Sequence, residues 1–152
     1  MSTDKNVASD LMKTLEDGKD GFAKAAGLVE QGSPEIRATF LRLSQQRMSF
    51  YDELHKMAKD YGDPIEASGT IAAAFHRGWM TLKDAVSGSD PSGVLDAAVQ
   101  GEEHAVKSYE TALESSDLSS GLRLVLARQM DDLLKAYIEV KALRDLHQTN
   151  GS

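Results

Sequence analysis

The chain has 152 residues, a length that suits one domain of ordinary size. It carries 17 Lys and Arg against 24 Asp and Glu, so its formal net charge is −7, and its isoelectric point is near 5.0. This acidic balance disfavours nucleic acid and anionic membrane surfaces as partners, because both carry negative charge. The absence of cysteine excludes disulfides, thiol catalysis and cysteine-bound zinc.

No stretch of the sequence is apolar for long enough to span a bilayer. The first six residues lack the apolar run of a signal peptide. We therefore expect a cytoplasmic protein that folds as a single helical domain over residues 1–152 and does not associate with a membrane.

Apolar residues recur at steps of three and four along most of the chain, which is the spacing of amphipathic helices and not of strands. Ile36, Phe40 and Leu43, for example, share one face of a helix that begins after an N-cap at Ser33. Turns rich in glycine, serine and proline separate the periodic stretches. The pattern predicts four long helices and one shorter helix, over residues 4–30, 34–61, 91–115 and 118–148 and, for the shorter one, 68–87.

The four long helices form two pairs, and a tight turn joins the members of each pair into an antiparallel hairpin. The segment between the second and third long helices is long enough to run the length of a bundle, and most of it is helical. The fold class is therefore predicted as all-α: a ferritin-like four-helix bundle with a long helical crossover, and not a simple up-down-up-down bundle.

Polar residues occupy the centres of the apolar stripes near the middle of the long helices. Arg47, Glu102 and Gln129 each have apolar neighbours on the same helix face. The matching position on the first helix is Gly18, whose missing side chain would leave room for a long one. Counting from the connecting turns places all four at one height, so we expect a central polar layer.

We expect Arg47 and Glu102 to form a buried salt bridge, because burying an ion without a partner costs several kcal/mol. Gln129 and a phenol, from Tyr51 or Tyr109, would satisfy the remaining donors and acceptors. The alternative is that the helix phases are wrong by one residue, so that both charges lie at the surface.

The same height is where ferritin-like proteins hold two metal ions, bound by a Glu from each of two helices and by Glu-x-x-His from each of the other two. Glu-x-x-His does not occur in this sequence, and the nearest match is residues 52–55 (DELH), in which Asp52 faces away from the stripe. Glu102 is the one carboxylate at the centre of a stripe. We therefore predict no catalytic residue, no bound metal and no cofactor, with a dinuclear metal centre as the alternative.

Several segments resemble a bacterial ferritin-like four-helix-bundle family of unknown function. The segments that show the likeness are residues 15–22 (LEDGKDGF), 43–47 (LSQQR), 76–79 (HRGW), 101–102 (GE) and 105–109 (AVKSY). The resemblance covers about residues 4–146 and implies the ferritin-like fold, a cytoplasmic setting and kinship with bacterial stress-response proteins. It implies no known reaction. The chain departs from the resemblance at Tyr137, where relatives often carry His, and this departure further disfavours a metal site.

These observations favour a non-catalytic bundle with a stress-associated or scaffolding role that acts through protein contacts. One alternative is a metal-binding oxidase or storage protein of the di-iron or di-manganese type. Another is an adaptor recognised through the crossover helix, where His76, Arg77 and Trp79 would form a partner surface.

Apolar residues that lie away from the stripe centres favour self-association as a two-fold dimer, the commonest kind of oligomer. The residues expected to be exposed in this way are Met12, Leu28, Leu41 and Met48.

Overall fold

The structure is a computed structural model that describes residues 2–29, 33–59 and 92–150. The expected crossover helix at 68–87, with His76, Arg77 and Trp79, lies outside the described residues. Within them there are four helices and no strand. The helices are α1 (Ser2–Leu28), α2 (Pro34–Lys59), α5 (Ser92–Leu113) and α6 (Ser120–Asn150).

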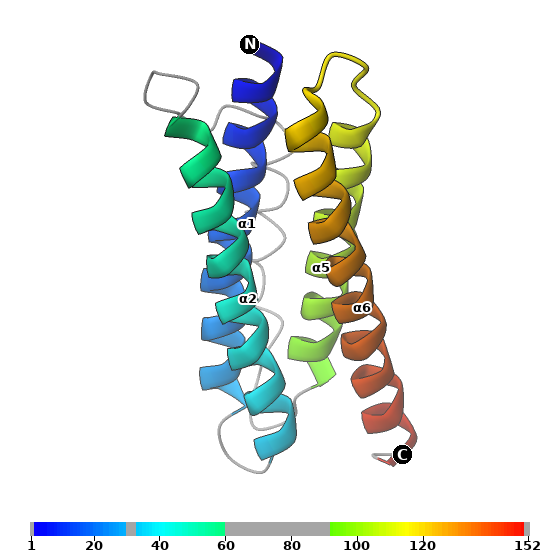
Figure 1. Ribbon diagram of the computed structural model, residues 1–152. Coiled ribbons are helices and arrows are strands. Elements are labelled where there is room, and N and C mark those ends of the chain that lie inside the picture. The colour runs from blue at the N-terminus through cyan, green and yellow to red at the C-terminus, as the bar shows by residue number, and fades with distance from the viewer. Residues whose placement is uncertain (1, 30–32, 60–91, 151–152) are drawn as a thin grey trace.

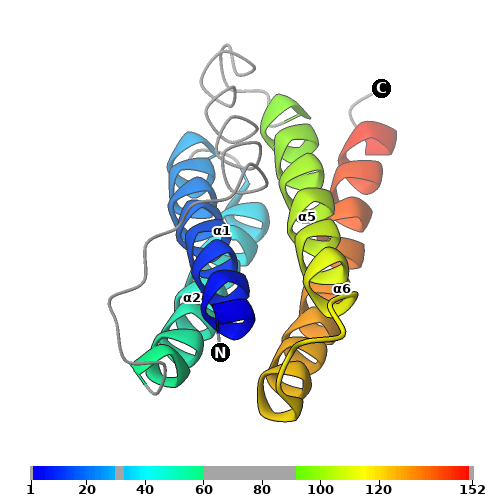
Figure 2. The ribbon, with the colours of Figure 1, turned by 90° about the horizontal axis from the view of Figure 1, so that it is seen from above.

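The four helices pack side by side as two antiparallel hairpins, α1 with α2 and α5 with α6 (Figure 1). The hairpins meet where α1 contacts α5 and α2 contacts α6, so α2 and α5 are diagonal to each other across the bundle (Figure 2). Figure 1 also shows that α2 and α5 run in the same direction. The predicted all-α four-helix bundle is confirmed.

Side-chain caps explain where α5 ends and α6 begins. Ser119 is the N-cap of α6, since its Oγ accepts the N–H of Leu122 at 3.3 Å. The N–H of Ser119 in turn donates to Asp4 Oδ1 at 2.9 Å, which ties the first turn of α1 to the start of α6. The Arg123 guanidinium donates to the carbonyl oxygens of Leu113, the last residue of α5, and of Ser115, just after the helix ends.

The core lies between the four apolar faces, and its largest apolar side chains are fully buried. The rings of Phe22 and Phe40 join α1 to α2, with centroids 5.7 Å apart. Other fully buried apolar side chains are Leu15, Leu43, Leu54, Leu95, Leu122 and Leu126.

The expected exposure of four apolar residues is correct for three of them. Leu28, Leu41 and Met48 are 39%, 37% and 42% exposed, whereas Met12 is only 6% exposed. The prediction for Met12 was wrong because α1 packs against both α2 and α5, so the buried arc of α1 is wider than a single stripe. None of the described helices is both long and apolar enough to cross a membrane.

Candidate functional site: a buried polar layer

Arg47 and Glu102 form a salt bridge across the middle of the bundle. Arg47 comes from α2 and Glu102 from the diagonally opposite α5, and Nη2 of the guanidinium donates to Oε1 of the carboxylate. Both side chains are 1% exposed. The predicted buried salt bridge is confirmed, and because it runs diagonally it connects the two hairpins through the core.

Two further neighbours hold the Arg47 guanidinium. Its Nη1 donates to Gln46 Oε1, and its Cζ lies 5.2 Å from the ring centroid of Phe22 on α1, a cation–π contact. Gly18 is buried on α1, one turn before Phe22. Neither Gln46 nor Phe22 was predicted as a partner of Arg47, although Phe22 shares a stripe with Gly18 at a spacing of four residues.

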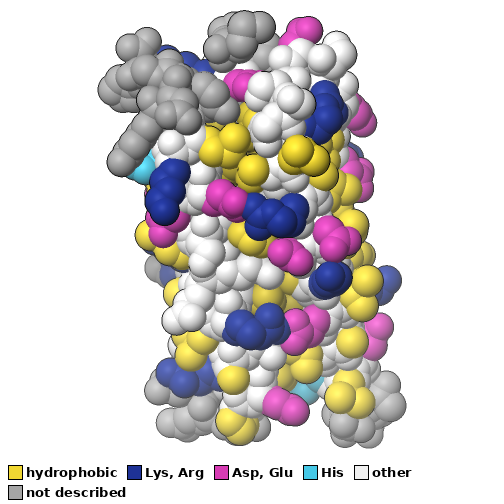
Figure 3. Space-filling view, in the orientation of Figure 1, with side chains coloured by type: hydrophobic (Ala, Val, Ile, Leu, Met, Phe, Trp, Pro, Cys, Tyr) yellow, Lys and Arg dark blue, Asp and Glu magenta, His cyan; other side chains and the backbone are white. Residues whose placement is uncertain are grey.

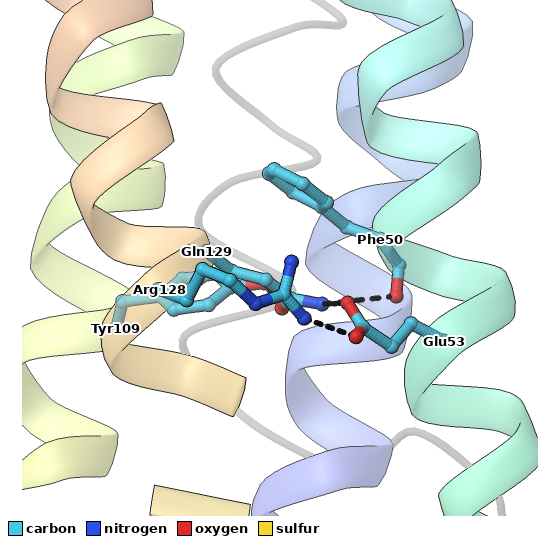
Figure 4. Close-up of polar contacts among 5 residues, drawn as sticks. All are labelled: Phe50, Glu53, Tyr109, Arg128 and Gln129. Carbon is cyan, nitrogen blue, oxygen red and sulfur yellow. Dashed lines mark hydrogen bonds and ion pairs between the residues drawn. The ribbon is translucent and has the colours of Figure 1, made fainter. Parts of the chain in front are cut away.

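Gln129 belongs to a second polar chain, which leads from the core to the surface (Figure 4). The Tyr109 hydroxyl donates to Gln129 Oε1 at 2.7 Å. Gln129 Nε2 donates to Glu53 Oε1 at 2.8 Å and to the carbonyl oxygen of Phe50 at 3.4 Å. Glu53 Oε2 pairs with Arg128, which is about half exposed. Gln129 was expected to bind the remaining donors and acceptors of the salt bridge. Instead, its amide forms hydrogen bonds with Tyr109, Phe50 and Glu53.

Tyr51 does not extend the layer as the sequence suggested. Its ring stacks on His55, with centroids 6.1 Å apart and an interplanar angle of 11°. It also lines a shallow groove of about 210 Å³ between α1 and α2, together with Leu15, Lys19 and Met48. Four residues along a helix amount to roughly 400°, so Tyr51 is rotated by about 40° from Arg47, and this places its ring in the groove.

Burial governs the protonation of the layer. It raises the pKa of the Glu102 carboxyl above its ordinary value of 4.5, and the Arg47 guanidinium opposes this shift. Burial also raises the pKa of the Tyr109 hydroxyl, which therefore keeps its proton and acts as a donor. Glu102 Oε2 is buried and accepts no hydrogen bond from the described residues.

Nitrogen donors of the protein itself bind the carboxylates of Glu102 and Glu53. Glu102 accepts a hydrogen bond from Arg47, and Glu53 accepts hydrogen bonds from Gln129 and Arg128. Within the described residues, no three His, Asp or Glu side chains are grouped so that they could hold a metal ion. Tyr137, at the position where the sequence departs from its resemblance, donates to Glu103 at the surface over 3.2 Å.

Charged pairs also join α2 to α6 outside the layer. Arg42 pairs with Glu139, and Glu53 pairs with Arg128. Figure 3 shows Lys or Arg side chains beside Asp or Glu side chains along this face, with apolar side chains between them. These exposed pairs contribute little stability each, because water and salt screen them. The buried pair is therefore the more informative feature of the site.

A comparison with protein families finds one match, to a domain of unknown function (DUF2383), over residues 5–115. The match includes Arg47, Glu102 and Tyr109 and ends before α6, which supplies Gln129. No curated protein matches the chain.

Proposed function

The chain belongs to the DUF2383 family, a domain of unknown function, and we propose that it is a non-catalytic, ferritin-like bundle that acts through contacts with other proteins, in a scaffolding or stress-associated role in the cytoplasm. One observation carries this proposal. The height at which a di-metal bundle places carboxylates around metal ions is filled here by a guanidinium bound to the central carboxylate.

The parallel direction of α2 and α5 supports the ferritin-like part of the proposal. Because α2 ends at one end of the bundle and α5 begins at the other (Figure 1), a single long crossover between them would give the one-crossover topology. The proposed domain includes α6, which supplies core residues such as Leu122 and Leu126.

A metal-binding oxidase or storage protein is the rival function, and one feature favours it. Glu102 Oε2 is buried without a hydrogen bond from the described residues, so this oxygen is able to accept a cation or a proton. For a metal to bind there, the Arg47 guanidinium would have to move away from the carboxylate, because the two positive charges would repel each other.

Metal analysis of the intact protein separates the two functions. The protein is purified without chelator, loaded with ferrous iron in air and compared with Glu102→Gln and with Glu103→Gln, an exposed neighbour that serves as the control. We expect background metal content and equally slow oxygen consumption in all three proteins. Two metal ions per chain with rapid oxygen consumption, lost in Glu102→Gln and kept in Glu103→Gln, would establish the rival instead.

A further inference from the structure

Helix α6 carries large apolar side chains on two opposite faces. Its inner face buries Leu122, Leu126 and Leu133 in the core. Its outer face carries Leu124, Ile138 and Leu146, which are 73%, 65% and 57% exposed. These exposures are the highest among the large apolar side chains of the described residues. One apolar face is enough to pack a surface helix against its own core, and the opposite face is then typically polar.

The outer residues of α6 form one continuous strip. At about 100° per residue, Leu124, Asp131, Lys135 and Ala142 lie within roughly 20° of a single line along the helix, and Arg128, Ile138 and Leu146 flank this line at roughly 40°. Asp131 and Lys135 form an ion pair with Nζ and Oδ2 3.2 Å apart, and both side chains are more than half exposed. The strip therefore has a charged centre between apolar ends, an arrangement that suits a specific partner surface.

We infer that this strip binds the same strip of a second copy of the chain, with the two α6 helices antiparallel and a two-fold axis beside residue 133. This inference rests on the proposal that the bundle acts through protein contacts, and it names the partner. In this register Asp131 faces the partner's Lys135, and Lys135 faces the partner's Asp131. Two ion pairs within the helices thus become a ring of four alternating charges, while Leu124 packs on the partner's Ala142.

Charge complementarity selects this register over its neighbours. An axis beside Ile138 would place Asp131 against the partner's Asp145, and this contact is repulsive. An axis beside Lys135 would place that lysine against its own copy. The axis beside residue 133 also lets the two helices overlap from residue 120 to residue 146, so that the apolar residues at both ends of the strip contact the partner.

The size of the strip sets the expected affinity. At 1.5 Å per residue the overlap is about 40 Å long, and one helix face is about 10 Å wide, which gives roughly 400 Å² for each copy. Stable interfaces bury about 800 Å² on each partner. Because this area is only about half of that of a stable interface, we expect a weak dimer that crosslinking can trap, with a dissociation constant of roughly 10 μM or above.

Cysteine crosslinking tests the register directly, because the natural chain contains no cysteine. Leu124→Cys and Ala142→Cys are oxidised separately and as a mixture, and we expect disulfide-linked dimers to form at least tenfold faster in the mixture. The control replaces Leu124→Cys by Leu41→Cys on α2, which is also exposed and should not crosslink. Rapid crosslinking of Leu124→Cys with itself would indicate parallel helices, and equal rates in all samples would indicate random collision; either result overturns the proposal.

Charge reversal gives an independent test by sedimentation at protein concentrations up to about ten times the dissociation constant. Asp131→Lys or Lys135→Asp makes the ring of four charges all positive or all negative, so each should weaken the dimer at least tenfold. The double variant restores alternation and should restore the dimer, while circular dichroism verifies that all variants fold. Failure of the double variant to recover would overturn the α6 interface. The proposed function would still be decided separately by the metal analysis, which does not depend on dimerisation.

Discussion

At the scale of single residues, Arg47 is held by groups from three helices. Glu102 on α5 binds one end of the guanidinium, Gln46 on α2 binds the other end, and the ring of Phe22 on α1 covers its face. A buried charge is tolerated when it is paired with an opposite charge and hydrogen-bonded. The carboxylate is less completely satisfied, because only one of its oxygens receives a hydrogen bond from the described residues.

This imbalance predicts a specific dependence of stability on pH. Because burial raises the pKa of Glu102 in the fold, the folded protein binds a proton at this site that the unfolded chain has already released above pH 4.5. The stability that this group contributes is thus fully present below its unfolded pKa and is lost as pH rises through its folded pKa.

The measurement compares the wild type with Glu102→Gln, which cannot titrate, by urea unfolding from pH 4 to pH 8. The free energy of unfolding of the wild type minus that of the variant should decrease as pH rises, by at most about 1.4 kcal/mol per pH unit. An increase with pH would mean that Arg47 outweighs burial and lowers the pKa of Glu102.

Tyr109→Phe tests the second polar chain. Removing the hydroxyl leaves Gln129 Oε1 buried without its donor, so we expect a loss of about 1–3 kcal/mol in the free energy of unfolding. Tyr51→Phe is the matched control, since that residue is half-buried and its ring contact with His55 is kept. Equal losses in the two variants would show that the bond to Gln129 contributes nothing.

The sequence allowed the Arg47–Glu102 pair to be predicted because two opposite charges stood at the centres of apolar stripes at one height. It did not allow Gln46 or Glu53 to be predicted as partners, because both lie at the edge of the α2 stripe. At such an edge, a long side chain can turn toward either the core or the solvent. Only the positions of the neighbouring helices decide which way it turns.

At the scale of the helices, the periodicity of apolar residues predicted the four described helices, and it was less accurate for the residues at which they begin and end. The last helix was expected at 118–148 and extends over Ser120–Asn150. The start shifts because Ser119, and not a residue before 118, caps the helix. The residue at which α6 begins depends partly on the contact between Ser119 and Asp4. Because Asp4 is distant in sequence, the local pattern could not predict this contact.

Ser119→Ala tests this cap. The variant loses the acceptor for the N–H of Leu122, so the free energy of unfolding should fall by about 0.5–2 kcal/mol. Asp4→Ala should cost a similar amount if the contact between α1 and α6 matters, because it leaves the N–H of Ser119 without this acceptor. Ser120→Ala is the control. A Ser119→Ala variant as stable as that control would contradict the assignment of the cap.

At the scale of the whole molecule, the diagonal salt bridge holds together two hairpins that otherwise meet along α1–α5 and α2–α6. The family match stops at residue 115, yet α6 completes the core and supplies the amide that binds Tyr109 and Glu53. The bundle, and not the matched segment alone, is therefore the unit in which the polar layer is satisfied.

Arg47 and Glu102 form a structural pair across the core. Removing one partner leaves a buried charge, whereas replacing both with apolar residues of similar volume leaves none. Urea unfolding of Glu102→Leu, Arg47→Met and the Arg47→Met/Glu102→Leu double variant measures the difference. Glu102→Leu should lose about 3–5 kcal/mol, and the double variant should lie within about 1 kcal/mol of the wild type. Small losses that add in the double variant would contradict the claim.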